Sequence, residues 1–291
     1  MPKLRAMLGL ILLVQAIGVS SALAQTATSP AAAASAAQQQ AQQQQDRDLT
    51  LNLAQPDFTL AALPTTLRLP KHKSAFRVTH RFGRPLGRGS FGSLAEDFFG
   101  LDSGAQIGLE FRYGIRSGTQ VGVNRTSDRT IEFFAQHEVK GQSESFPVTM
   151  TVLGLAEGTN NFRDSYSPGI GLLVSRTISD RAAVYVEPVW VNNTNVLPSA
   201  LVDNNDTTLL GLGTRVRIRP SVYLVLEGAP RVAGYDPDVT HISVGLEKRA
   251  GGHLFQLNFS NGFGTTFAQI ARGGTSNDDW YLGFNISRKF Y

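Results

Sequence analysis

The chain has 291 residues, 42% of them hydrophobic, no cysteine and a formal net charge of +4. This length suffices for one sizeable core or one large barrel, and the lack of cysteine excludes disulfides, thiolate metal sites and lipid-anchored cysteines. Loss of Lys3 and Arg5 with the leader described next would lower the net charge by two, to +2, which is too small to indicate a nucleic-acid partner.

The first residues have the pattern of a secretory signal peptide. Lys3 and Arg5 precede an apolar run over residues 6–19, and Ala22-Leu23-Ala24 supplies a small-residue cleavage site. A membrane anchor is the alternative, but the run is shorter than the roughly 20 residues that span a bilayer. We therefore predict a signal peptide over residues 1–24 and export of the mature chain across the inner membrane.

Two further segments precede the first strand. Residues 25–48 are rich in alanine and glutamine and have nothing to bury, which predicts a disordered linker. Residues 49–73 place three prolines among alternating apolar residues. This second pattern predicts an extended periplasmic lead-in that plugs or edges the domain after it.

Residues 74–291 are a succession of segments with a hydrophobic period of two. In residues 106–115, for example, Ile107, Leu109 and Phe111 alternate with polar or small side chains, as in a strand with one apolar face. Most segments fit the roughly 9–11 residues of a tilted transmembrane strand better than the 5–6 typical of globular strands. Pro188 interrupts one of them, because proline cannot donate to the ladder. The twelve predicted strands are 75–83, 104–115, 118–125, 129–140, 146–156, 167–178, 182–192, 207–219, 221–229, 239–250, 253–262 and 280–290.

The links between these strands alternate in length. Every second link has five residues or fewer, and the others are mostly long, with only residues 126–128 breaking the rule. Short periplasmic turns and long outer loops are typical of outer-membrane barrels, and an even strand number places both termini in the periplasm. We therefore predict an all-β, transmembrane, antiparallel up-and-down barrel of about twelve strands in the bacterial outer membrane.

A secreted soluble β-sandwich or soluble barrel is the rival interpretation, since it also alternates polar and apolar residues. In such a protein the polar parity, which is the set of every second residue along a strand, would face water and carry many lysines and glutamates. Here that parity is rich in glycine, asparagine, glutamine and serine. A β-helix is disfavoured because no short repeat recurs at a fixed period.

The last strand ends in aromatic residues. Its outward parity holds Phe284, Ile286 and Phe290, with Tyr291 one residue beyond. This terminus resembles the C-terminal signature of bacterial outer-membrane barrels, which implies that the barrel-assembly machinery reads it as an insertion signal. We expect this strand to pair with the first strand near residues 76–82. Arg288 shares the lipid-facing parity, so it should lie near the periplasmic interface and snorkel.

Residues 74–291 resemble a family of bacterial outer-membrane β-barrel proteins known as a domain of unknown function. The resemblance implies a fold and a compartment but no activity or catalytic residue. It is carried by Leu63-Pro64-Thr65-Thr66, Thr79-His80-Arg81-Phe82-Gly83, Phe98-Phe99-Gly100-Leu101-Asp102, Ile115-Arg116-Ser117-Gly118 and Gly283-Phe284-Asn285-Ile286-Ser287-Arg288.

Motifs for chemistry are weak. Residues 87–92 match the dinucleotide fingerprint G-x-G-x-x-G, but that motif needs a helix opening after it, and here the chain leads to another strand. We interpret it as a flexible outer loop. His137 and His241 lie near predicted strand ends and are the best candidates for an outer-membrane hydrolase, although a solvated or interfacial histidine is the plainer interpretation. We predict no catalytic residue, metal site or cofactor.

Charged residues collect on the inward parity. Charges cannot face lipid cheaply, since arginine or lysine there costs about 2–4 kcal/mol at the midplane, so they must face the lumen. They form either a polar conduit, in which Arg215 and Arg217 would favour anions, or ion pairs that fill a narrow barrel, which we prefer. Outward aromatics such as Tyr113, Trp190, Phe255 and Phe259 suit interfacial girdles, with burial in a soluble core as the alternative. The predicted lumen charges are Glu110, Arg112, Glu132, Glu187, Arg215, Arg217, Glu227 and Glu247, with Glu138 and Arg249 on the same parity.

These features predict a passive, porin-like channel or small-molecule transport component whose substrate the sequence does not name. The alternative is a non-conducting barrel that holds a periplasmic partner through the Gln-rich segment. An outer-membrane hydrolase is the third interpretation. The expected partners are the lipid bilayer and the assembly machinery, with no nucleic acid.

Overall fold

The structure is a computed structural model that describes residues 51–100, 104–273 and 276–291. The predicted signal peptide (residues 1–24) and the Ala/Gln-rich linker (residues 25–48) lie outside the described residues. Residues 48–291 form one compact unit. Among the described residues, none of the helices has the length and apolar character needed to cross a membrane.

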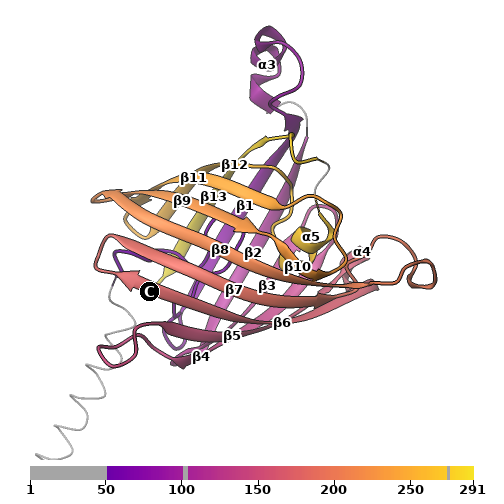
Figure 1. Cartoon of the computed structure of the whole chain (residues 1–291). Helices are drawn as coiled ribbons and strands as arrows, with labels where there is room; N and C mark the ends of the chain where they lie inside the picture. The colour runs from indigo at the N-terminus through magenta and orange to yellow at the C-terminus, as the bar shows by residue number, and fades with distance from the viewer. Residues whose placement is uncertain (1–50, 101–103, 274–275) are drawn as a thin grey trace, which may run out of the picture. The chain divides into compact units, whose positions relative to one another are not determined.

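One antiparallel sheet closes on itself to make a barrel (Figure 1). Closure occurs because β1 pairs with β13 and β8 pairs with β9. The short β10 continues β9 beyond Pro230 and pairs with the same neighbour, β8, so the barrel has twelve strands, as predicted. The strands are β1 (Ser74–Pro85), β2 (Ala105–Arg116), β3 (Thr119–Thr126), β4 (Ile131–Lys140), β5 (Thr149–Gly158), β6 (Asp164–Ile178), β7 (Ala182–Asn192), β8 (Asp206–Arg219), β9 (Val222–Ala229), β10 (Arg231–Gly234), β11 (His241–Ala250), β12 (His253–Ser260) and β13 (Tyr281–Phe290).

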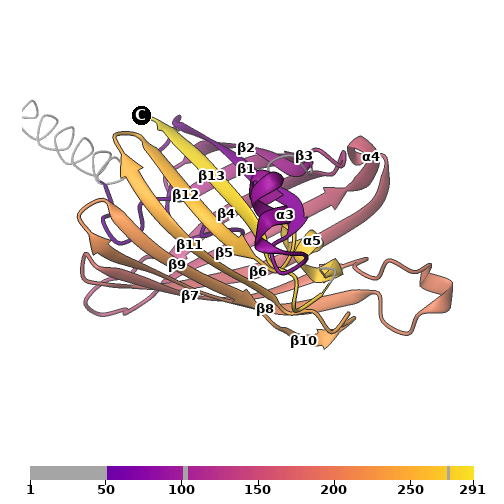
Figure 2. The ribbon, with the colours of Figure 1, turned by 90° about the horizontal axis from the view of Figure 1, so that it is seen from above.

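The last strand, β13, lies between β1 and β12 and so pairs with the first strand, as expected. β13 pairs with β1 from Ser74↔Phe290 to Arg81↔Gly283 and with β12 on its other edge (Figure 2). The expected pairing near residues 76–82 is therefore confirmed. The chain end joins the ladder because its alternating pattern matches both neighbours.

The apolar parity faces outward and the polar parity faces the lumen. On β2, Ile107, Leu109 and Phe111 are 38–44% exposed, whereas Glu110 and Arg112 on the other parity are buried. The aromatic side chains of Tyr113, Trp190, Phe255 and Phe259 are likewise exposed on the outside. An outer surface covered with apolar side chains suits lipid, and charged side chains are kept inside.

The two ends of the barrel differ in their links. At one end, here called the turn end, the links are residues 117–118, 141–148, 179–181, 220–221 and 251–252, and the C-terminus lies there too. At the other end, the loop end, the links carry the short helices α3 (Phe91–Glu96), η1 (Phe98–Gly100), α4 (Thr159–Phe162), η2 (Ser199–Leu201) and α5 (Phe267–Arg272). The predicted alternation of short and long links holds at most positions. The turn-end link 141–148 is longer than predicted, and the loop-end link 159–163 is shorter because β5 and β6 extend further than the sequence indicated.

Two local features differ from or extend the sequence expectations. The glycine-rich segment 87–92 opens the six-residue α3, which Ser90 caps, rather than an unstructured loop. The sheet is wholly antiparallel in the described residues, so no parallel βαβ unit supports a dinucleotide site. At Pro188 the ladder between β6 and β7 skips Glu187 and Pro188 while the register stays the same on both sides.

Candidate functional site: the plugged lumen

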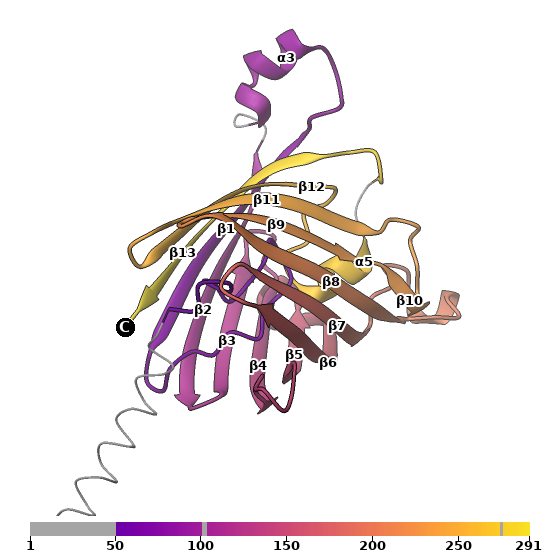
Figure 3. The same ribbon diagram turned by 60° about the vertical axis from the view of Figure 1, so that its left-hand side comes forward.

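Residues 54–66, here called the plug, lie inside the barrel (Figure 3). All thirteen are buried. They form a tight hairpin in which the Leu60 amide donates to the Leu63 carbonyl (2.7 Å) and the Thr65 amide donates to the Phe58 carbonyl (2.8 Å). The plug therefore brings main-chain polar groups into the middle of the lumen, where each needs a partner.

One carboxylate on the barrel wall holds the tip of the plug. Glu227 on β9 accepts hydrogen bonds from the amides of Ala61 (2.9 Å), Ala62 (2.9 Å) and Leu63 (3.1 Å). His241 on β11 also contacts this carboxylate, with Nε2 3.0 Å from Oε1. Successive amides that converge on one anion make a cradle for negative charge, and Glu227 fills it from the wall.

Donors on β1, β12 and β13 hold carbonyls of the same turn. Arg77 and Arg81 on β1 both donate to the Ala61 oxygen, the latter at 3.1 Å, and Asn285 on β13 donates to it at 3.0 Å. Gln256 on β12 donates to the Leu60 oxygen at 3.1 Å. The wall therefore contacts both the donors and the acceptors of the turn.

A buried ion pair holds the base of the plug. Arg215 and Glu247 are fully buried and bidentate, with N–O distances of 2.7 and 2.9 Å. The same guanidinium donates to the carbonyls of Thr59 (2.7 Å) and Asp57 (3.4 Å). Such a pair is strong because it satisfies both ions and two main-chain groups at once.

Inward-facing glycines make room for the plug. A Cβ on Gly213 would lie 2.2 Å from Leu60 Cδ1, and one on Gly211 would lie 3.3 Å from Leu63 Cδ1. On β2, a Cβ on Gly114 would lie 2.2 Å from the Pro70 oxygen, where the chain between the plug and β1 passes close to the strand. The glycine-rich inward parity thus serves close packing of an internal segment.

The loop end of the lumen is filled by α5. Its residues Phe267, Ala268, Ile270 and Ala271 are buried in the same apolar cluster as the plug leucines. At the end of the helix, Arg272 pairs with Glu157 on β5 at 2.5 Å. The link between β12 and β13 therefore folds back into the barrel.

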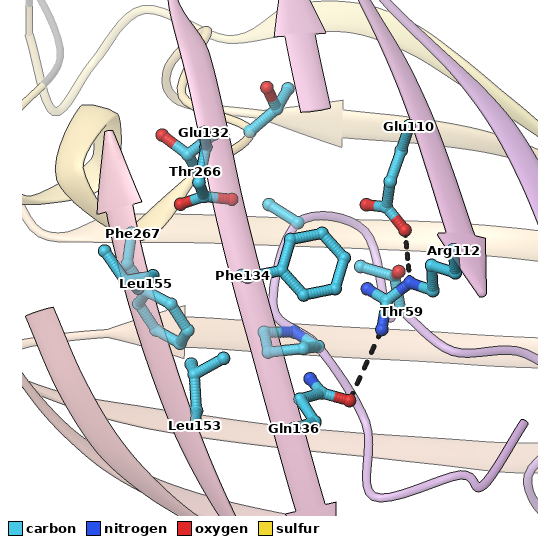
Figure 4. A pocket seen from close by; sticks show the side chains of 13 residues that line it. Thr59, Glu110, Arg112, Glu132, Phe134, Gln136, Leu153, Leu155, Thr266 and Phe267 are labelled. Atoms are coloured by element: carbon cyan, nitrogen blue, oxygen red, sulfur yellow. Dashed lines mark hydrogen bonds and ion pairs between the residues drawn. The ribbon is translucent and has the colours of Figure 1, made fainter. Parts of the chain in front are cut away.

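Little space remains between these parts. The cavity between the plug, α5 and β2–β5 measures about 30 Å³ and is lined by Thr59, Arg112, Glu132 and Phe134, among others (Figure 4). Two further cavities measure about 10 Å³ each. Cavities of this size hold water molecules rather than larger solutes.

Seven of the eight predicted lumen charges are buried on the inner face, and the eighth, Arg217, lies at the turn-end mouth, 4.0 Å from the exposed Asp180. Ion pairs join close positions on the wall, such as Arg112 with Glu110, and the plug and α5 fill the space across the lumen. Sequence reasoning missed the inward residues of β1, β12 and β13 that contact the plug. The same parity rule, extended to those strands, would have found them. They are Arg77, Arg81, Gln256 and Asn285.

Two buried charges stand out because their partners are incomplete. Among the described residues, Arg81 has no carboxylate within ion-pair distance and contacts only neutral oxygens, those of His80, Ala61 and Asn285. Glu187 on β7 is fully buried with no hydrogen-bond partner for either carboxylate oxygen in that part of the chain. Buried charges without counter-ions are costly, so they point to function more than to stability.

The two histidines named as candidates for catalysis do not lie in one site. His137 lies exposed on the outer face, with Nδ1 2.8 Å from Thr119 Oγ1, and His241 contacts Glu227 in the lumen. Within residues 51–100, 104–273 and 276–291, no cluster of histidine and carboxylate side chains could hold a metal ion.

Three of the residues named as the insertion signal, Phe284, Ile286 and Phe290, share the outward parity of β13, and Tyr291 follows the strand. Phe284 and Ile286 are half-buried, whereas Phe290 and Tyr291 are 45% and 43% exposed. Arg288 is exposed near the turn end, and its guanidinium lies 5.3 Å from the Phe290 ring centroid.

Comparison with solved structures finds other barrels with little sequence in common. The KdgM porin in complex with disordered oligogalacturonate is 10% identical, covers 75% of this chain and 99% of its own, and has a TM-score of 0.47. The NanC porin is 9% identical at 75% and 99% coverage with a TM-score of 0.49. The Acinetobacter baumannii outer membrane protein Omp33 is 8% identical at 78% and 100% coverage with a TM-score of 0.42. Similarity at this level does not extend to solute or mechanism.

Comparison with curated proteins gives no match. Comparison with family models gives a match over residues 57–290, which begins inside the plug and ends at the last strand. That span includes the twelve strands, the plug turn and α5. The chain therefore belongs to the family described as Membrane bound beta barrel domain (DUF5777), a family of unknown function.

Proposed function

We propose that the protein is a porin-like channel for small polar solutes in the bacterial outer membrane, and that the plug closes its lumen reversibly. The observation that carries this proposal is the ring of buried charged and polar side chains on the inner wall, from Arg77 on β1 to Asn285 on β13. A barrel that served only as a scaffold could fill its interior with apolar side chains. A polar inner wall is what a water-filled pathway requires.

The contacts of the plug suit repeated release. Glu227, Arg77 and Arg215 bind its main chain through hydrogen bonds. When the plug leaves, water can replace each of these bonds, and the net cost of exchanging one is only about 0.5–1.5 kcal/mol, or about 1.5–3 kcal/mol where a charge takes part. The conformation described here is the closed one.

A second candidate function is a closed barrel that binds a periplasmic partner through the Gln-rich segment. The observation that favours it is the filled lumen, in which the cavity beside Arg112 and Glu132 measures only about 30 Å³. Both candidates share the same compartment, which the predicted signal peptide and C-terminal strand would supply through export and the barrel-assembly machinery.

An engineered disulfide distinguishes the two functions. Thr66 on the plug and Ser175 on β6 have hydroxyl oxygens 2.5 Å apart, so Thr66→Cys with Ser175→Cys places two sulfurs near the about 2.0 Å of a disulfide. The chain has no other cysteine. The matched control, Thr194→Cys with Thr207→Cys, joins a loop to β8 at an oxygen distance of 2.8 Å and leaves the plug free.

We expect the wild-type chain and the reduced Thr66/Ser175 variant to show discrete openings in planar bilayers. Oxidation should abolish the openings of that variant and leave the control unchanged. A wild-type barrel that is folded by heat-modifiable gel mobility but electrically silent would favour the closed interaction barrel. Equal conductance before and after oxidation would show that solutes bypass the plug.

A further inference from the structure

The main chain of Ala61 spans two walls of opposite charge. Its amide donates to the Glu227 carboxylate at 2.9 Å, and its carbonyl oxygen accepts from Arg77, Arg81 and Asn285. One residue therefore presents its own nitrogen to an anion and its own oxygen to two cations. The atoms between those two contacts are N, Cα, C and O.

A free α-amino acid has the same four atoms with charges that fit these walls better. Its carboxylate would carry the negative charge that Arg81 lacks as a partner, and its ammonium group would face Glu227. The neutral peptide satisfies the geometry of the site but gives Arg81 no counter-ion. The bonds of Ala61 to the charged side chains already have one ionised partner each, and a zwitterion would add the Coulomb attraction of opposite charges to them, so it is the better ligand for this arrangement.

A second carboxylate strengthens the acidic side. Glu187 lies next to the plug, because its Oε2 and Leu63 Cδ1 are 3.2 and 3.3 Å from the position of a Cβ on Gly211. It also interacts electrostatically with Glu227. Two carboxylates in one buried site are costly to ionise together, and a bound cation between them would offset this cost.

We propose that the site now occupied by Ala61 binds the backbone zwitterion of a free α-amino acid when the plug withdraws. Arg77, Arg81 and Asn285 would bind the carboxylate, and Glu227 and Glu187 would bind the ammonium group. The inference deepens the proposed channel function by naming its solute class, and it rests on that function for access to the lumen. Inorganic anions and simple cations each match only one wall and are repelled by the other.

The rate of solute entry into proteoliposomes tests the proposal. It is measured at low solute concentration, where weak binding inside the channel raises the rate of passage. The probes are L-alanine, its neutral analogue lactamide, the cation L-alaninamide and the anion L-lactate. The variants are Arg81→Gln and Glu227→Gln. The control is Arg217→Gln at the turn-end mouth, whose guanidinium lies 4.0 Å from the exposed Asp180. Heat-modifiable mobility verifies that each barrel is folded.

We expect L-alanine to enter wild-type vesicles at least about tenfold faster than the other three probes, a factor that corresponds to about 1.4 kcal/mol. The ratio should fall toward one in Arg81→Gln and Glu227→Gln and stay unchanged in Arg217→Gln. A looser plug would raise the entry of all probes together, so the ratio separates recognition from opening. Equal entry of the four probes into wild-type vesicles, or an unchanged ratio in Arg81→Gln, would overturn the site while leaving the channel intact.

Binding in detergent tests the site without conduction. The reduced Thr66→Cys/Ser175→Cys variant should bind L-alanine saturably at millimolar concentration, because a tethered plug competes at an effective concentration of that order. Oxidation should abolish this binding. If the wild-type barrel passes no solute but binding is redox-dependent, the channel function fails and the site stands. Absence of binding by the reduced protein overturns the site.

Discussion

The plug and α5 both fill the lumen, but different forces hold them. The plug turn is bound mainly through its main chain, which contacts Glu227, Arg77 and Arg215. The α5 helix is bound mainly through apolar burial of Phe267 and Ile270. The plug is attached to the barrel at one end, by Ser74, whereas α5 is attached at both ends, by β12 and β13.

This difference identifies which element can move. A segment held by hydrogen bonds exchanges them with water at small net cost, whereas exposing an apolar helix costs about 25 cal/mol per Å² of surface. The plug also buries Leu60 and Leu63, so its release has a cost in free energy as well. The comparison predicts that the plug opens the lumen while α5 narrows it permanently.

The largest effect is expected from Arg215→Met. It leaves Glu247 buried without a cation and frees two plug carbonyls, so the free energy of unfolding should fall by about 3–5 kcal/mol. The measurement is urea unfolding followed by the fluorescence of the two tryptophans, Trp190 and Trp280, and by gel mobility. Arg217→Met, which touches neither the plug nor a buried acid, should change stability by less than about 1 kcal/mol.

The double variant Arg215→Met/Glu247→Met sharpens this prediction. Removing both ions restores a neutral core, so most of the lost stability should return. What remains lost measures the contacts of Arg215 with the plug. Full recovery together with normal closure would show that these contacts do not hold the plug, which would weaken the contrast with α5.

Two alanine substitutions, one in the plug and one in α5, test the roles of the two elements. Ile270→Ala and Leu63→Ala each remove a buried aliphatic side chain and should each cost about 2–5 kcal/mol of stability. Only Leu63→Ala should raise the open probability in planar bilayers, because α5 stays tethered to β12 and β13. Increased opening in Ile270→Ala alone would reverse the roles assigned to the two elements.

The smallest effect on stability is expected at the C-terminus. Phe290 and Tyr291 are about half exposed, so replacing either with alanine should cost about 1 kcal/mol. Phe290→Ala should nevertheless reduce the yield of inserted barrel more than Tyr291→Ala, because Phe290 is in register with the outward parity. Membrane fractionation and heat modification measure this yield, and equal normal insertion of both variants would contradict it.

Much of the barrel could be predicted because its signals are local. The alternation around Leu109 or Phe284, the link lengths and the terminal pairing each depend on a few neighbouring residues, and the structure has strands within a few residues of the predicted bounds. The inward placement of Glu110, Arg215 and Glu247 followed from the same period. The helix α3 was missed because its six residues follow Ser90 without an apolar face to bury.

The sequence alone therefore determined the strand count, the inside and outside of the wall and the family, since a period of two assigns every side chain to lipid or lumen. Only the tertiary structure decided what fills the lumen. Ala61 meets Glu227 across 166 positions of sequence and Asn285 across 224. No local pattern encodes such contacts, because they exist only once the wall has closed around the plug and brought β1, β9 and β13 to face the same turn.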